Sequence, residues 1–284
     1  MLSVVEVTEE NLEEARSYLD AYAETSQFLI GNLIDYGPRM GDHHNSGNFR
    51  MIKEGSEVTG VFALAKRGNL LARLDRPEES ATLVLEACAR EPVALRGFIG
   101  DWKSMEPICR LFKARNPDFK PGYESKEILY RYVLDRGDTK IVHDPRVRLL
   151  EKSDYSQYFA HSRAYNLELK LPEQVGEEAV RREFEMRVET KVWWGLFEGE
   201  TLASMASLNA WSETIGQVGG VFTPPERRQR GLSKATMLHL LKDCRDLHGH
   251  SKSILFTGQT DIAAQKLYES IGYERIGHFA LIFE

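Results

Sequence analysis

The chain has 284 residues, of which 42% are hydrophobic and 28% charged, and it carries a net charge of -6. That composition is typical of a globular protein and argues against long disordered segments, and the lack of a basic excess argues against a nucleic-acid binder. The longest apolar stretches, such as 192–197, are far shorter than the ~20 residues that a membrane span needs.

The start of the chain is acidic, with Glu6, Glu9 and Glu10, so no secretory signal is expected there. Cys88, Cys109 and Cys244 are widely spaced and odd in number, which favours reduced, buried thiols over a disulfide framework or a metal site. We therefore predict a cytoplasmic protein that binds neither nucleic acid nor membrane. The composition leaves open whether the chain forms a homodimer.

The first half of the chain predicts an α/β unit. Strands are expected at 3–7, 49–53, 58–66, 70–74, 94–99 and 127–135, and helices at 9–23, 78–89 and 102–114. A turn-rich stretch, 135–145, then interrupts the apolar periodicity and predicts a linker.

The second half predicts the same order of elements. Strands are expected at 147–150, 192–198, 202–210, 215–223, 253–257 and 273–283, and helices at 153–166, 177–189, 232–247 and 261–270. We infer two tandem α/β units, at 1–138 and 146–284, each a twisted mixed sheet flanked by helices.

The junction between the predicted strand 215–223 and the predicted helix 232–247 carries the most informative chemistry. Pro224 and Pro225 end the strand, because neither can donate to a sheet ladder. A helix start has free amide hydrogens and a positive dipole end, which together favour a phosphate. Gly231 allows close approach, and Arg228 supplies planar donors. A capped surface helix with solvated arginines is the alternative, because short glycine motifs often match by chance.

Two motifs here resemble the GNAT superfamily of acetyltransferases. Arg228-Gln-Arg-Gly-Leu-Ser233 is similar to the family's coenzyme-A signature Q/R-x-x-G-x-G/A, with serine in the last position. The segment from Ala264 to Tyr273 is similar to the family's last helix, A-x-x-x-Y-x-x-x-G-F/Y. The resemblance covers about 146–284 and implies a GNAT fold there.

The resemblance also implies an acetyl-CoA site. The strand end would separate from the strand near 255–257, the pantetheine would bond to the backbone of Val221 and Thr223, and the pyrophosphate would sit on the helix amides. The cofactor-binding residues implied are Val221, Phe222, Thr223, Arg228, Gln229, Arg230, Gly231, Leu232, Ser233 and Lys234.

Tyr268 is implied as the catalytic general acid that protonates the departing thiolate. A phenol of pKa about 10 can serve a thiol of pKa about 8.5. Spacing alone instead places Tyr268 on an apolar helix face.

The general base cannot be read from the sequence. Gln217 stands where some relatives have glutamate, and glutamine cannot take a proton. Glu213 reads as a surface turn residue, and a water chain or a neutral amine is equally compatible. Asp261 replaces an asparagine that contacts the cofactor in many relatives, so that role is not carried over.

The first half lacks both motifs. Its equivalent junction, 74–80, has no glycine, and Glu78 and Glu79 would repel a phosphate. The half therefore resembles a GNAT copy without its cofactor site. No metal is predicted, because adjacent His43 and His44 lack a third ligand at helical spacing. Trp193 and Trp194 are expected to point to opposite faces of a strand.

These patterns predict an N-acetyltransferase that uses acetyl-CoA and a small-molecule or peptide amine. Two alternatives stay open: a non-catalytic acyl-CoA-binding or regulatory module, and an acyltransferase with a longer acyl donor or a non-amine acceptor.

Overall fold

The computed structural model describes residues 1–135, 137–169 and 176–284 of the chain. Its contacts divide it into two compact units. Unit 1 comprises Met1–Leu129, Phe256–Thr260 and Arg275–Glu284, and unit 2 comprises Tyr130–Leu255 and Asp261–Glu274. The ranges 1–138 and 146–284 expected from the sequence stay a prediction, and the last residues of the chain belong by contacts to unit 1.

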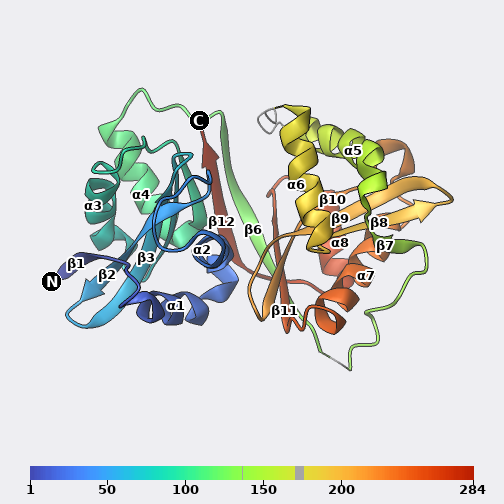
Figure 1. The fold of residues 1–284 in the computed structure, drawn as a ribbon, viewed down its shortest axis with the longest axis horizontal. Helices are drawn as coiled ribbons and strands as arrows, with labels where there is room; N and C mark the ends of the chain where they lie inside the picture. The colour runs from blue at the N-terminus through green and yellow to red at the C-terminus, as the bar shows by residue number, and fades with distance from the viewer. Residues whose placement is uncertain (136, 170–175) are drawn as a thin grey trace. The chain divides into compact units, whose positions relative to one another are not determined.

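Unit 1 is a mixed sheet between two pairs of helices (Figure 1). Its elements are β1 (Leu2–Glu6), α1 (Leu12–Ala21), α2 (Ala23–Tyr36), β2 (Gly47–Glu54), β3 (Glu57–Ala65), β4 (Asn69–Leu74), α3 (Pro77–Cys88), β5 (Gly97–Asp101) and α4 (Trp102–Arg115). The strand order is β1-β2-β3-β4-β5-β12, in which β12 (Glu274–Phe283) comes from the end of the chain and pairs antiparallel with β5. Strand β6 (Tyr123–Val133) is divided between the units after Leu129.

Unit 2 repeats this order of elements. They are β7 (Val147–Leu149), a short 3-10 turn (Lys152–Asp154), α5 (Tyr155–Glu168), α6 (Glu177–Glu189), β8 (Trp193–Glu198), β9 (Thr201–Trp211), β10 (Ile215–Phe222), α7 (Leu232–Asp246), β11 (Lys252–Thr257) and α8 (Ile262–Ile271). The strand order is β11-β10-β9-β8-β7, and only β10 and β11 are parallel in this set. Helices α5 and α6 cover one face of β8–β10 and α7 covers the other (Figure 1).

The cores follow the apolar periodicity of the sequence. In α7, Met237, Leu240, Leu241 and Cys244 are fully buried, as their helical spacing predicts. On the opposite face of the sheet, α5 and α6 enclose an aromatic cluster that includes Tyr158, Phe184, Trp193 and Phe222. The three cysteines are free and buried, and none of the described helices is long and apolar enough to cross a membrane.

The mixed α/β fold class predicted from the sequence is confirmed. Helix α2 was not expected, because its buried face mixes polar Ser26 and Gln27 with Leu29, Ile30 and Leu33, which weakens the apolar pattern. The predicted linker contains no described helix or strand between Val133 and Val147, and Arg136 lies outside the described residues.

Candidate functional site

The site is built on the end of β10, an inner strand of unit 2. Strand β10 pairs in parallel with β11 from Ile215, which lies opposite Lys252, to Gln217, which lies opposite Ile254. Strand β10 itself continues to Phe222. A register shift against β9 follows Gln217, and another separates Gly219 from Phe222. An inner strand is normally covered on both faces, yet 219–221 are partly exposed while 215–218 are buried. The strand is therefore partly exposed next to Val221, where the family resemblance implies the pantetheine.

Two glycines lie in this partly exposed stretch. Gly220 has a φ of 61°, and a Cβ there would come within 2.7 Å of the Trp193 ring. At Gly219 a Cβ would come within 2.5 Å of the Asn209 side-chain nitrogen. Both positions thus lack room for a side chain, because Asn209 and Trp193 pack directly against the backbone there.

The loop after β10 turns into α7 through left-handed backbone. Gln229 has a φ of 61°, and Gly231, the N-cap of α7, has a φ of 75° and a ψ of 8°. No side chain in the described part of the chain caps the helix, and its first turn carries no acidic residue. The main-chain bond back to the cap runs from Ala235 N–H to Gly231 O, at 3.0 Å. The amides of Leu232, Ser233 and Lys234 are thus the free donors of the helix start.

Such an N-terminus suits an anion. A left-handed residue followed by helical backbone directs successive N–H groups into one concavity, and the helix dipole adds positive potential. Among the described residues, no heavy atom lies within 4 Å of a Cβ built on Gly231. A ligand can therefore approach the backbone closely at this point.

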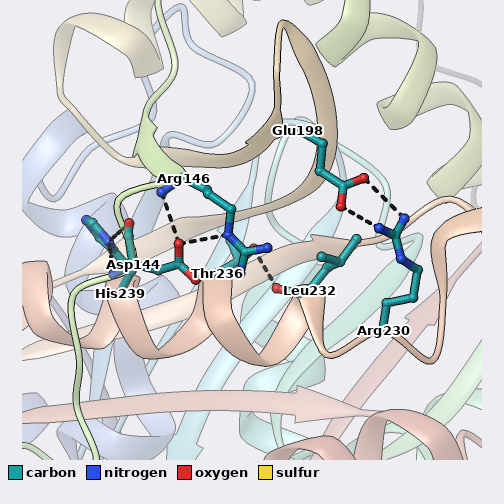
Figure 2. A network of polar contacts seen from close by, with 7 residues as sticks. All are labelled: Asp144, Arg146, Glu198, Arg230, Leu232, Thr236 and His239. Carbon is teal, nitrogen blue, oxygen red and sulfur yellow. Dashed lines mark hydrogen bonds and ion pairs between the residues drawn. The ribbon is translucent and has the colours of Figure 1, made fainter.

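The loop arginines are already paired with acids. Glu198, at the end of β8, binds Arg230 through two hydrogen bonds of 2.6 and 3.1 Å (Figure 2) and Arg227 through one of 2.6 Å. Arg228 donates to Glu168 at 2.5 Å and to the Thr223 carbonyl at 2.9 Å. Two carboxylates thus offset part of the loop's charge, and the uncommitted donors are backbone amides.

A chain of hydroxyl groups ties the strand end to the helix start. Thr223 Oγ1 donates to Ser204 Oγ at 2.9 Å, and Ser233 Oγ lies 2.7 Å from Thr223 Oγ1. Because the single proton of Thr223 goes to Ser204, Ser233 must donate to Thr223. The serine that replaces the family's glycine or alanine thus fixes the loop in this arrangement, and its proton is not available to a phosphate.

The other predicted cofactor residues take distinct places. Phe222 is buried in the aromatic cluster, Leu232 is buried in the first turn of α7, and the Lys234 side chain donates to the Ser270 carbonyl at 3.1 Å. Val221 is partly exposed at the open strand end. The structure thus gathers all ten residues at one strand-to-helix junction; their role in binding stays a prediction.

Tyr268 lies on the buried face of α8, 7% exposed, with its ring edge-on to those of Tyr130 (6.1 Å) and Tyr273 (6.0 Å). The packing expected from spacing alone is therefore present, and the general-acid role stays a prediction. The neighbouring N-cap, Asp261, accepts a hydrogen bond from Ala264 N–H at 3.0 Å, which gives this carboxylate a structural task.

No carboxylate stands at the position of the expected base. Gln217 is buried, and its amide donates to Asn209 at 2.9 Å. Glu213 is exposed in the turn between β9 and β10, as the sequence predicts. His161 packs edge-on against Phe222 at 5.6 Å, and burial lowers the pKa of its imidazole.

The equivalent junction of unit 1 is closed. Pro77, the first residue of α3, has no amide hydrogen, and Glu78 and Glu79 follow it in the first turn. The N–H of Leu74, at the end of β4, donates to Ser104 Oγ at 3.0 Å. In this copy the helix start therefore lacks one amide hydrogen and carries two negative charges, and the amide at the strand end is hydrogen-bonded within the chain.

The described residues contain no cluster of three or more His, Cys, Asp or Glu side chains suited to a metal ion. The His43 ring instead stacks on the Tyr36 ring, and the His44 ring is tilted against His43. The arrangement in unit 2 can hold a phosphorylated ligand on helix amides and present a thioester over an open strand.

Comparison with known proteins supports this interpretation. Residues 157–273 match the model of the acetyltransferase (GNAT) family. Human N-acetyltransferase 8 is 36% identical over 61 residues, which are 22% of this chain and 26% of that protein, so the match spans about a quarter of the relative.

Solved structures extend the likeness to the whole chain. A GCN5-related N-acetyltransferase from Sphaerobacter thermophilus has a TM-score of 0.61 at 11% identity, with 100% of this chain and 95% of that one covered. A tandem GNAT protein from the clavulanic acid biosynthesis pathway has a TM-score of 0.52 at 14% identity, with 100% and 98% covered. At these identities the structures show a shared fold.

Proposed function

We propose that this chain, a tandem-domain member of the GNAT superfamily, transfers an acetyl group from acetyl-CoA to a primary amine. The observation that carries the proposal is the β10–α7 junction, where an open strand leads into an uncapped helix start at a left-handed glycine. The cofactor's pyrophosphate would rest on the amides after Gly231, and its pantetheine would run along 221–223.

The chemistry needs few groups from the protein. An amine attacks the thioester carbonyl, the C–N bond forms, and the tetrahedral intermediate expels CoA as a thiolate. Tyr268 would protonate that thiolate. The protein's main contribution is then to hold both reactants in line, which can supply much of the rate enhancement.

A non-catalytic acyl-CoA-binding module is the second candidate. The observation that favours it is Gln217, a buried amide bonded to Asn209 where some relatives place a carboxylate. An acceptor amine that arrives neutral would need no such base, so the amide does not exclude catalysis.

Release of free CoA from acetyl-CoA, measured with a panel of amines, amino acids and peptides, separates the two. Turnover with any acceptor eliminates the binding-only function. Tight CoA binding without turnover across the panel would instead support it. Cytoplasmic location and homodimer formation stay predictions.

A further inference from the structure

Trp193 and Trp194 are neighbours in β8, and their indole N–H groups differ in one respect. Trp194 is fully buried and donates to Asp243 Oδ2 at 2.8 Å. Trp193 is 7% exposed, and its Nε1 is buried with no hydrogen-bond partner among the described residues. A buried donor without a partner destabilises a fold, so it calls for an explanation.

Packing alone does not explain the indole at Trp193. The ring belongs to the aromatic cluster beneath α5 and α6, with the Tyr158 ring edge-on at 5.0 Å. Phenylalanine would supply apolar contact there without introducing an unpaired N–H.

The position of the ring points to a ligand. Its outer edge lies against Gly220, where a Cβ would come within 2.7 Å of Cη2. Gly220 lies in the middle of the partly exposed stretch 219–221 of an otherwise covered strand. The six-membered ring of the indole therefore faces the open strand end, and Nε1 belongs to the five-membered ring fused to it.

We propose that Trp193 Nε1–H binds the acceptor substrate, and that this acceptor is an amine carrying a hydrogen-bond-accepting oxygen, as a carboxylate or an amide carbonyl. The inference rests on the proposed acetyl transfer. Helix α7, whose first amides form the proposed pyrophosphate site, covers the face of the sheet opposite α5 and α6. The indole lies under α5 and α6, so its partner belongs to the acceptor.

The variant Trp193→Phe keeps an aromatic ring and removes only the donor and part of the ring area. We expect the KM for glycine and for glycinamide to rise about 10-fold, the scale of one hydrogen bond. The KM for acetyl-CoA and the turnover of propylamine, which has no oxygen, should stay unchanged. Glycine and glycinamide together distinguish a carboxylate from an amide as the oxygen source.

Trp194→Phe is the matched control. It removes a satisfied donor and leaves Asp243 short of a partner, so its melting temperature should fall by several degrees while acceptor KM values stay constant. Trp193→Phe loses no protein hydrogen bond, but its smaller ring leaves a cavity in the aromatic cluster, so its melting temperature should also fall. The two variants are therefore distinguished by their acceptor KM values, which should change in Trp193→Phe alone.

A binding experiment tests the inference without turnover. In protein with ¹⁵N-labelled indoles and saturated with CoA, the Trp193 resonance is the one absent from Trp193→Phe. Addition of glycine or glycinamide should shift it, and propylamine should not. An unshifted resonance overturns the role of Trp193. If Trp193→Phe loses turnover of glycine, glycinamide and propylamine equally, the role of Trp193 is also overturned, but acetyl transfer by the wild-type protein is not. If the wild-type protein turns over no amine at all, the proposed function is rejected instead.

Discussion

Gly231→Asp tests the anion site most directly, because the backbone at this position permits the change without a clash. The residue is left-handed, with a φ of 75°, and nothing lies within 4 Å of the point where a Cβ would stand. A side chain other than glycine costs roughly 1 kcal/mol of left-handed strain, and less for aspartate and asparagine. The fold should therefore persist.

The charge is the larger effect on binding. A carboxylate about 5 Å from a phosphate, at an effective dielectric constant of about 20, is repelled by roughly 3 kcal/mol. Solvent screening at this exposed loop reduces the repulsion to about 2–3 kcal/mol. The dissociation constant of CoA should rise about 30- to 200-fold.

Calorimetric titration with CoA, together with melting curves, measures both effects. Gly231→Asn has nearly the same shape without the charge and should lose much less affinity. Gly249→Asp shares the left-handed φ, 71°, and the open surroundings, and lies outside the proposed site, so it should bind CoA like wild type. If Gly231→Asp binds CoA with wild-type affinity, the pyrophosphate is not held at this helix start.

The remaining predictions concern catalysis, stoichiometry and acid stability. Tyr268→Phe should lower turnover about 100-fold with little change in CoA affinity if the hydroxyl is the general acid; an unchanged rate would leave it the packing role. Titration with CoA should saturate at one equivalent per chain, because Glu78 and Glu79 occupy the first turn of α3; two equivalents would contradict a closed first copy. Burial, followed by the charge of His248, lowers the pKa of His250 to about 4. Its contribution to stability is present above the unfolded pKa of about 6.5 and is lost as the pH falls towards 4, so wild type should lose about 2 kcal/mol more than His250→Gln between pH 7 and pH 5. Urea unfolding at the two pH values measures this difference, and parallel losses in both proteins would refute it.

The order of helices and strands could be predicted from the sequence because each element shows in the local spacing of its apolar residues. The helix predicted at 177–189 has those bounds in the structure, and the apolar face of α7 is buried as its spacing indicates. Two features could not be predicted. Helix α2 buries polar Ser26 and Gln27, which breaks the apolar pattern. The pairing of β12 with β5 joins residues more than a hundred positions apart, and local patterns carry no information about such partners.

The candidate site likewise has one part that could be predicted from the sequence and one part that could not. Gly231 and the arginines around it stand in one short segment, so the helix start and its anion chemistry can be predicted from their spacing. Glu198 and Ser204 belong to β8 and β9, and their bonds to the loop depend on how those strands lie beside β10. No sequence signal marks either residue as part of the site.

The clearest evidence for function comes from comparing matched positions within one chain. Pro77 at the start of α3 has no amide hydrogen and is followed by Glu78 and Glu79, whereas α7 begins at Gly231 with no acidic residue in its first turn. Trp194 has its donor satisfied by Asp243, whereas Trp193 beside it has none among the described residues. An unpaired buried group costs free energy, although Trp193 is not alone, since Ser26 Oγ and Ser80 Oγ in unit 1 are also buried without a partner among the described residues. The Trp193 ring adjoins Gly220 in the open stretch 219–221 of β10, and the start of α7 follows β10 after one short loop. That arrangement is what the two proposed ligands, a phosphorylated cofactor and an oxygen-bearing amine, would require.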